Sequence, residues 1–64
     1  MKVRVFLDNG NISICDTSFV PTLKTHENGK VYLEVVADTK GEIWMFNWDI
    51  VNAYQLSGVT FANE

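Results

Sequence analysis

The sequence predicts a small all-β domain, in which five or six short antiparallel strands form a meander that closes into a barrel or a strongly curved sheet. Apolar and polar residues alternate in the first segment, turn signals with glycine recur at short intervals, and β-branched and aromatic residues fill the segments between the turns. At 64 residues, the chain is expected to form one domain over residues 1–64. Residues 57–64 are expected to be a frayed tail or a short added strand.

The first hairpin is indicated by the alternating residues 2–8 and by the Asn9-Gly10 pair that follows them. Asn-Gly favours a two-residue turn, because both central residues of a type I′ turn have positive φ. That turn gives a register with two apolar pairs on one face: Leu7 opposite Ile12, and Val5 opposite Ile14.

The second hairpin follows a connection over residues 17–20 and turns at Glu27-Asn28-Gly29. A two-residue loop at this turn would mix apolar and polar residues on both faces. A three-residue loop, with Gly29 in the left-handed conformation, keeps the apolar residues together and is preferred. It pairs Thr25 with Val31, and Leu23 with Leu33.

A strand over residues 30–37 is expected to turn at residues 38–41 into the next strand. A three-residue loop over residues 39–41 pairs Ala37 with Ile43, and Val35 with Met45. Residues 42–48 are apolar on both sides, which predicts a strand that is covered on both faces.

After this strand, Asp49 is expected to cap a short helical turn, and residues 52–56 are expected to form a last strand. Val, Ile and Tyr in this segment favour a strand. The alternative is a single helix over residues 50–57 that ends at Gly58.

The run from Lys2 to Asp16, the turn at Asn28-Gly29 and the segment Phe46-Asn47-Trp48-Asp49-Ile50-Val51 resemble the very short SH3-like or Sm-like proteins of Gram-positive phages and prophages. In that group, two hairpins lead to a closing aromatic-Asp-hydrophobic corner and a final strand. The resemblance implies an SH3-like or Sm-like barrel and an accessory protein that acts on a host factor. It carries no site residue over to this chain.

An aromatic face is the candidate interaction surface. In the preferred register, one side of the sheet presents Tyr32, Trp44, Phe46 and Trp48, with Phe6 on the corresponding side of the first hairpin. A sheet this small cannot cover both of its faces, and an exposed aromatic face is typical of a contact surface. The alternative is that the barrel curls until some of these rings fill its interior.

Catalytic, cofactor and metal sites are not expected. Cys15 and His26 are the only candidates for a thiolate–imidazole pair, but Cys15 is expected on the outward side of a strand and His26 beside a turn. One Cys and one His are too few for a structural zinc site, and the acidic residues fall at turns and strand ends.

The charge balance argues against nucleic acid as a ligand. The formal net charge is −3, and the five Lys and Arg residues form no patch that would neutralise phosphates. No apolar run is long enough for a membrane span and no signal peptide is evident, so a cytoplasmic location is expected. The expected function is a non-enzymatic interaction module that forms a homo-oligomer and binds or inhibits a host protein. The alternative is a single-stranded nucleic-acid or nucleotide binder that stacks bases on its aromatic side chains.

Overall fold

The structure, a computed structural model, describes residues 1–39 and 41–63 and is all-β, as the sequence predicts. Among these residues there are seven strands and one short 3₁₀ turn. They are β1 (Lys2–Leu7), β2 (Ile12–Asp16), β3 (Thr22–Thr25), β4 (Val31–Val36), β5 (Ile43–Asn47), η1 (Trp48–Ile50), β6 (Val51–Leu56) and β7 (Val59–Ala62). No helix in this part of the chain is long and apolar enough to cross a membrane.

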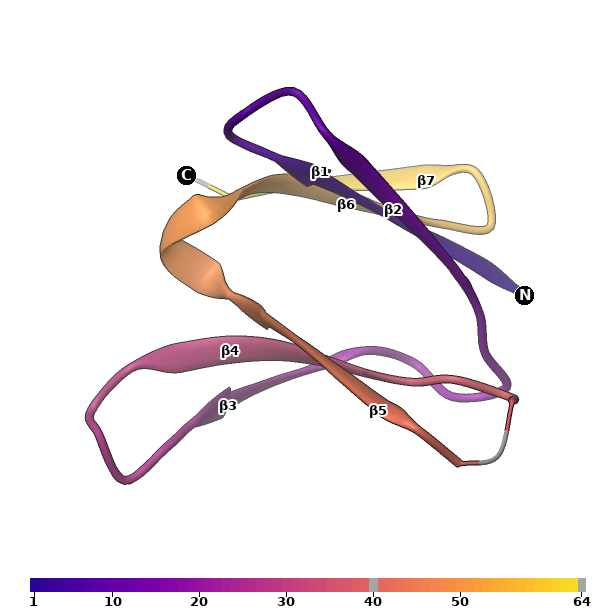
Figure 1. The fold of residues 1–64 in the computed structure, drawn as a ribbon. Helices are drawn as coiled ribbons and strands as arrows, with labels where there is room; N and C mark the ends of the chain where they lie inside the picture. Colours follow the sequence, from indigo (N-terminus) through magenta and orange to yellow (C-terminus); the bar gives the residue numbers. More distant parts are fainter. Residues whose placement is uncertain (40, 64) are drawn as a thin grey trace.

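The strands form two antiparallel sheets (Figure 1). One has four strands in the order β2-β1-β6-β7, and the other has three in the order β3-β4-β5. In Figure 1 the sheets lie one above the other, and η1 leads from the lower to the upper sheet. Because β1 pairs with β6, the topology is not a simple meander. No strand pairing joins the two sheets within the described residues, so the expected closed barrel is not confirmed.

The core lies between the inner faces of the two sheets. Its buried apolar residues are Val3, Val5, Cys15, Leu33, Val35, Ala37 and Val51. Val3 and Val5 are the inward positions of the alternating first segment, so that part of the prediction is confirmed. Each fully buried Val or Leu contributes about 1.5–3 kcal/mol relative to an exposed side chain.

The first hairpin forms, but the predicted register is wrong by one residue. Phe6 lies opposite Ile12 and Arg4 opposite Ile14, and the turn spans three residues that end at Gly10 with φ of 86°. The amide of Leu7 donates to the carbonyl of Asn11 across this turn at 2.9 Å. A shift of one residue moves every side chain of a strand to the other face. The side chains of Ile12 and Ile14 therefore lie on the outer face, away from Val3 and Val5.

The second hairpin has the predicted register. Leu23 lies opposite Leu33 and Thr25 opposite Val31, and Gly29 has φ of 80°. Leu23 is nevertheless 52% exposed, because β3 is an edge strand whose inner face is only partly covered.

The register between β4 and β5 differs by one residue from the prediction. Val36, not Ala37, lies opposite Ile43, and Trp44 rather than Met45 lies opposite Val35. The amide of Ala37 donates to the carbonyl of Glu42, so the loop is one residue longer than expected. Lys40, which the expected loop contains, is outside the described residues. Ile43 and Met45 are 58% and 56% exposed, so the prediction that both faces of β5 are covered is also wrong.

The turn and the strand expected after β5 are confirmed as η1 and β6, and the alternative helix over residues 50–57 does not form. The cap of η1 is Asn47 rather than Asp49, because the Asn47 side chain accepts a hydrogen bond from the Asp49 amide at 3.0 Å. The C-terminal segment forms the added strand, β7, which pairs with β6. Glu64, the last residue of the expected tail, is outside the described residues.

Candidate interaction surface

Trp44, Phe46 and Trp48, the centre of the expected aromatic face, are half-buried and pack against the core. On β5, Trp44 lies opposite Val35 and Phe46 opposite Leu33, two fully buried residues. Opposed residues of an antiparallel pair share one face of the sheet. The rings of Trp44 and Phe46 therefore project from the inner face, the reverse of the side expected from the sequence.

The corner at η1 continues this aromatic packing toward β7. The ring centroids of Trp48 and Tyr54 are 6.2 Å apart, and Tyr54 stacks on Phe61 at 5.1 Å with an angle of 21° between the ring planes. Nδ2 of Asn63 donates to the carbonyl oxygens of Trp48 and Val51 at 2.9 and 2.7 Å. These contacts hold the end of β7 to the corner.

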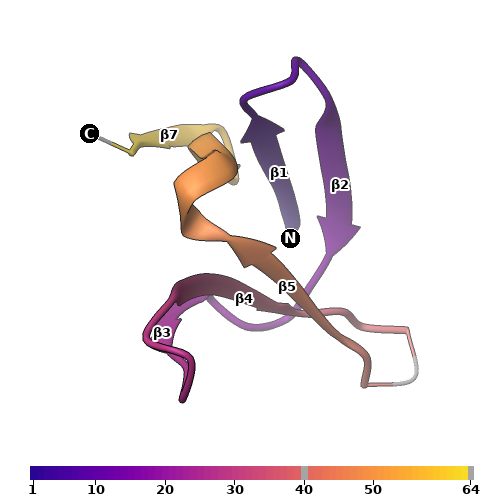
Figure 2. The same ribbon diagram turned by 60° about the vertical axis from the view of Figure 1, so that its left-hand side comes forward.

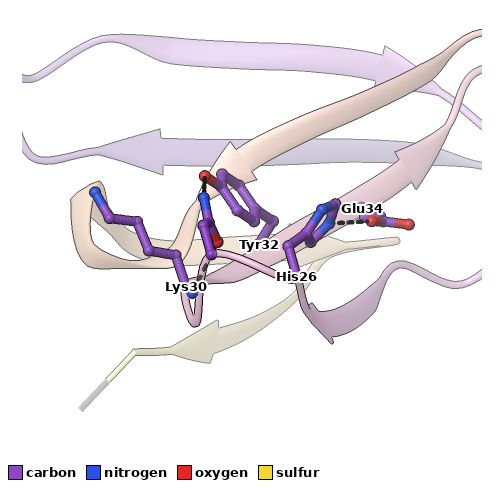
Figure 3. Close-up of polar contacts among 5 residues, drawn as sticks. His26, Lys30, Tyr32 and Glu34 are labelled. Carbon is purple, nitrogen blue, oxygen red and sulfur yellow. Dashed lines mark hydrogen bonds and ion pairs between the residues drawn. The ribbon is translucent and has the colours of Figure 1, made fainter.

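Tyr32 lies on the outer face of the three-stranded sheet, in a polar cluster at the β3–β4 turn (Figure 3). Nε2 of His26 and Oε2 of Glu34 are 2.8 Å apart, and the rings of His26 and Tyr32 meet edge to face with centroids 4.5 Å apart. Nδ2 of Asn28 donates to the Tyr32 hydroxyl at 3.1 Å, and Oδ1 of Asn28 accepts from the Lys30 amide at 2.9 Å. The polar atom of Tyr32 is thus engaged within its own hairpin.

An open depression of about 490 Å³ lies at this turn. It is lined by Lys24, Thr25, His26, Glu27 and Asn28. This lining comes from one strand end and the turn after it, and it carries both signs of charge. The depression therefore favours no single class of charged ligand.

Cys15 lies on β2 of the four-stranded sheet and His26 directly after β3 of the other sheet, and the side-chain hydrogen bonds of the two residues go to Asp16 and Glu34. Cys15 is on the inner side of β2 and only 5% exposed, so the prediction that it points outward is wrong. Burial, followed by the carboxylates of Asp16 and Asp38, raises the pKa of the Cys15 thiol. A raised pKa disfavours the thiolate that nucleophilic catalysis requires. Residues 1–39 and 41–63 also contain no group of three or more His, Cys, Asp or Glu side chains placed to hold a metal ion.

The outer face of the four-stranded sheet carries an apolar strip. Residues from its four strands lie side by side in the order Ile12, Phe6, Ala53, Ala62. Ile14 lies two residues from Ile12 on β2, and therefore on the same face. Ile12 and Ile14 are 55% and 53% exposed, and Phe6 is half-buried. We call these five residues the outer strip.

A polar row lies beside the outer strip. Nη1 of Arg4 donates to Oε1 of Gln55 at 3.3 Å, and Nε2 of Gln55 donates to the hydroxyl of Thr60 at 3.4 Å. The row thus links β1, β6 and β7 alongside the strip. Ile12, Phe6, Ala53 and Ala62 form a line across the sheet that contains no charged residue, whereas Ile14 lies opposite Arg4 at the end of the polar row.

The outer face of the three-stranded sheet has a smaller apolar group. It consists of Val36, Ile43 and Met45. This group extends over two strands, and Glu34 lies opposite Met45 within it. The outer strip extends over four strands and is the larger candidate contact surface.

Of the outer strip, the sequence predicts only Phe6 at a contact surface. It places Ile12 and Ile14 on the same apolar face as Leu7 and Val5, because the predicted first turn has two residues. A signal for the correct loop is present in the sequence, since Asp8-Asn9-Gly10 and Glu27-Asn28-Gly29 share the pattern acidic-Asn-Gly. In both turns the Asn side chain accepts a hydrogen bond from the amide two residues later, at 2.9 Å. The loop preferred for the second turn therefore also applies to the first.

Comparison with protein-family models, with curated proteins and with solved structures finds no match for this chain. The resemblance to short phage proteins thus has no support from known relatives and stays a prediction.

Proposed function

We propose that the chain is a non-enzymatic protein-interaction module whose contact surface is the outer strip of the four-stranded sheet. One observation carries the proposal: Ile12 is more than half exposed at the end of an uncharged line with Phe6, Ala53 and Ala62 across four strands, and Ile14, also more than half exposed, lies next to Ile12 on the same face of β2. Single exposed apolar residues are ordinary, but a contiguous apolar patch is typical of a contact site. The partners we propose are a second copy of the chain and a host protein.

The order of the elements is consistent with the proposed SH3-like arrangement. A hairpin leads to a three-stranded sheet, a 3₁₀ corner follows at Trp48–Ile50, and β6 then pairs back with β1. A function as a phage-type accessory protein is part of the same proposal and depends on that resemblance alone.

The alternative, a single-stranded nucleic-acid binder, is less well supported. Such a protein needs exposed aromatic platforms along a basic groove. Trp44, Phe46 and Trp48 pack against the core, and the formal net charge is −3. The stacking surface expected from the sequence is therefore not gathered on one exposed face.

The proposal is tested by comparing three bait proteins in quantitative affinity purification from host cells. The baits are the wild type, Ile14→Lys and the control Ile43→Lys. Ile43 is matched to Ile14 in residue type and exposure, at 58% against 53%, but lies on the other sheet. We expect a protein that the wild type and the control retain and that Ile14→Lys loses. The same set of proteins on all three baits would contradict the proposal.

A further inference from the structure

Strand β2 forms one margin of the four-stranded sheet, and no strand lies beyond it on the side away from β1 within the described residues (Figure 2). The N-terminal ammonium group of Met1 donates to the carbonyl of Thr17 at 2.9 Å, and the amide of Thr17 donates to the carbonyl of Met1 at 2.9 Å. Thr17 therefore directs its backbone groups toward β1. Because these groups alternate in direction along a strand, the odd-numbered residues of β2 also bond to β1, and the even-numbered residues do not. The N–H and C=O groups of Ile12 and Ile14 therefore point away from β1, and no hydrogen bond found in residues 1–39 and 41–63 uses them.

We infer that a second copy of the chain adds its own β2 to this edge, antiparallel and about a twofold axis. The inference rests on the proposed function and names the partner and the mode of contact. In a register centred on Ser13, the N–H and C=O of Ile12 bond to those of Ile14 in the second copy, and the twofold axis repeats both bonds. Each copy has four outward-pointing backbone groups here, the N–H and C=O of Ile12 and of Ile14, and all four are then hydrogen-bonded.

The far end of β2 disfavours the register centred on Ile14. The amide of Asp38 donates to the carbonyl of Asp16 at 2.9 Å and so covers the edge there. Pairing centred on Ile14 would place Ile12 of the second copy, a residue of its β2, opposite Asp16, where Asp38 already lies. Pairing centred on Ser13 places only Gly10, a residue of the turn before β2, opposite Asp16.

The side chains favour the same contact. On the outer face, Ile12 would lie beside Ile14 of the second copy, so that four isoleucines become contiguous and cover one another. Edge strands that avoid such pairing commonly carry proline, lysine or a bulge. The edge strand β3 has Pro21 before it and Lys24 within it, whereas residues 12–15 contain none of these features.

The other two edges are less suited to a symmetric contact. On β7 the outward-pointing groups belong to Thr60 and Ala62, which have small side chains. On β5 the outward-pointing groups belong to Ile43 and Met45. Symmetric pairing of two β5 strands would be centred on Trp44 and would place the half-buried indole rings of the two copies opposite each other. The β5 edge is the main competitor and supplies the control.

The inference is tested by disulfide trapping with Ser13→Cys. Residues opposed across the axis without hydrogen bonds have Cα atoms about 4.5 Å apart, within the range of about 4.4–6.8 Å for a disulfide. With diamide as oxidant, two Ser13→Cys chains should join, while the control Thr60→Cys, at the exposed opposite edge, should stay largely monomeric. Cys15 is present in both variants and is buried, so it contributes equally. Adding Ile14→Lys should abolish trapping, and adding Ile43→Lys should leave it unchanged.

Sedimentation of the wild type under reducing conditions gives a second measurement. The mass should rise from 7.3 kDa toward twice that value with concentration, and Ile14→Lys, but not Ile43→Lys, should remove the rise. The inference would be overturned if Ser13→Cys formed disulfide-linked dimers no faster than Thr60→Cys. It would also be overturned if the wild type sedimented as a monomer at every concentration, or if only Ile43→Lys lost association. If those results appear while the Ile14→Lys bait still loses a partner, the proposed function stands and only the self-pairing is wrong. Circular dichroism verifies the fold of each variant, and if Ile14→Lys fails to fold, the comparison of the two cysteine variants decides.

Discussion

Ile43 and Trp44 are neighbours on β5 that face opposite sides of the sheet. Ile43 is 58% exposed, whereas Trp44 is half-buried and packs against the core. The preferred register predicted from the sequence instead places Trp44 on the candidate contact face and Ile43 on the other face. No local property separates the two assignments, because β5 is apolar at four successive positions and either side of it can serve as the core face.

Substitution of these two neighbours should therefore have opposite consequences. Ile43→Thr should change the free energy of unfolding by no more than about 0.5 kcal/mol, because it alters an exposed position of a strand. Trp44→Thr should lower it by about 2–4 kcal/mol, because it removes a large ring that packs on the core. Thermal melting measured by circular dichroism checks both values, and a larger loss for Ile43→Thr would contradict the register between β4 and β5.

Burial of the Cys15 thiol should make stability depend on pH in the alkaline range. Because its pKa in the folded state is raised above the ordinary value of 9.0, the folded protein holds the thiol proton more tightly than the unfolded chain. The associated stability is complete below pH 9.0 and falls as the pH rises through the folded-state pKa. Urea titrations at a series of pH values should show this decline in the wild type and a smaller one in Cys15→Ala. An identical decline in both would indicate that Cys15 does not titrate with unfolding.

At the scale of the elements, the three hairpins with a predicted register show how far the sequence specifies strand pairing. The second hairpin is correctly predicted because only one loop length keeps Leu23 beside Leu33. The first hairpin is not, because β1 carries apolar residues on both faces, with Phe6 on the face opposite Val5. Ile12 therefore lies opposite an apolar residue in the predicted register and in the observed one. Alternation predicts the strands themselves, but loop length depends on the backbone conformation of single turn residues. The register predicted between β4 and β5 is wrong for the same reason, so Trp44 and Phe46 lie on the inner face while Tyr32 stays on the outer face.

The three-residue loop at Asp8-Asn9-Gly10 can be tested with D-amino acids in the chemically synthesised chain. Gly10 has φ of 86°, and Asn9 is not among the non-glycine residues with positive φ. D-alanine at position 10 should keep or slightly raise stability, because a D-residue prefers positive φ and restricts the unfolded chain more than glycine does. D-alanine at position 9 should cost about 1–2 kcal/mol, because it prefers the opposite sign of φ. A two-residue turn would instead favour D-alanine at both positions.

For the whole molecule, the small size of the domain explains why apolar surface is left exposed. A 60-residue domain buries only about 60% of the surface of its unfolded chain, and its net stability is typically no more than about 5 kcal/mol. The core of this chain lies between its two sheets and leaves the outer strip uncovered. A partner on that strip would add burial that the single chain lacks.

The charge of the whole molecule gives a separate expectation for nucleic acids. With a formal net charge of −3, binding to labelled single-stranded DNA or RNA should be weak and should vanish at about 0.15 M salt. Fluorescence anisotropy measures this. Sub-micromolar affinity at that salt concentration would restore the base-stacking alternative.

The exposure of Ile12 and Ile14 depends on the register between β1 and β2, and a nuclear Overhauser spectrum measures that register directly. Opposed residues without mutual hydrogen bonds have their Cα atoms only about 4.5 Å apart, so their Hα atoms give a strong cross-strand signal. The structure opposes Arg4 and Ile14 in this way, and a strong signal between their Hα protons is expected. A strong signal between the Hα protons of Val5 and Ile14 would instead place the isoleucines on the core face and contradict the proposed contact surface.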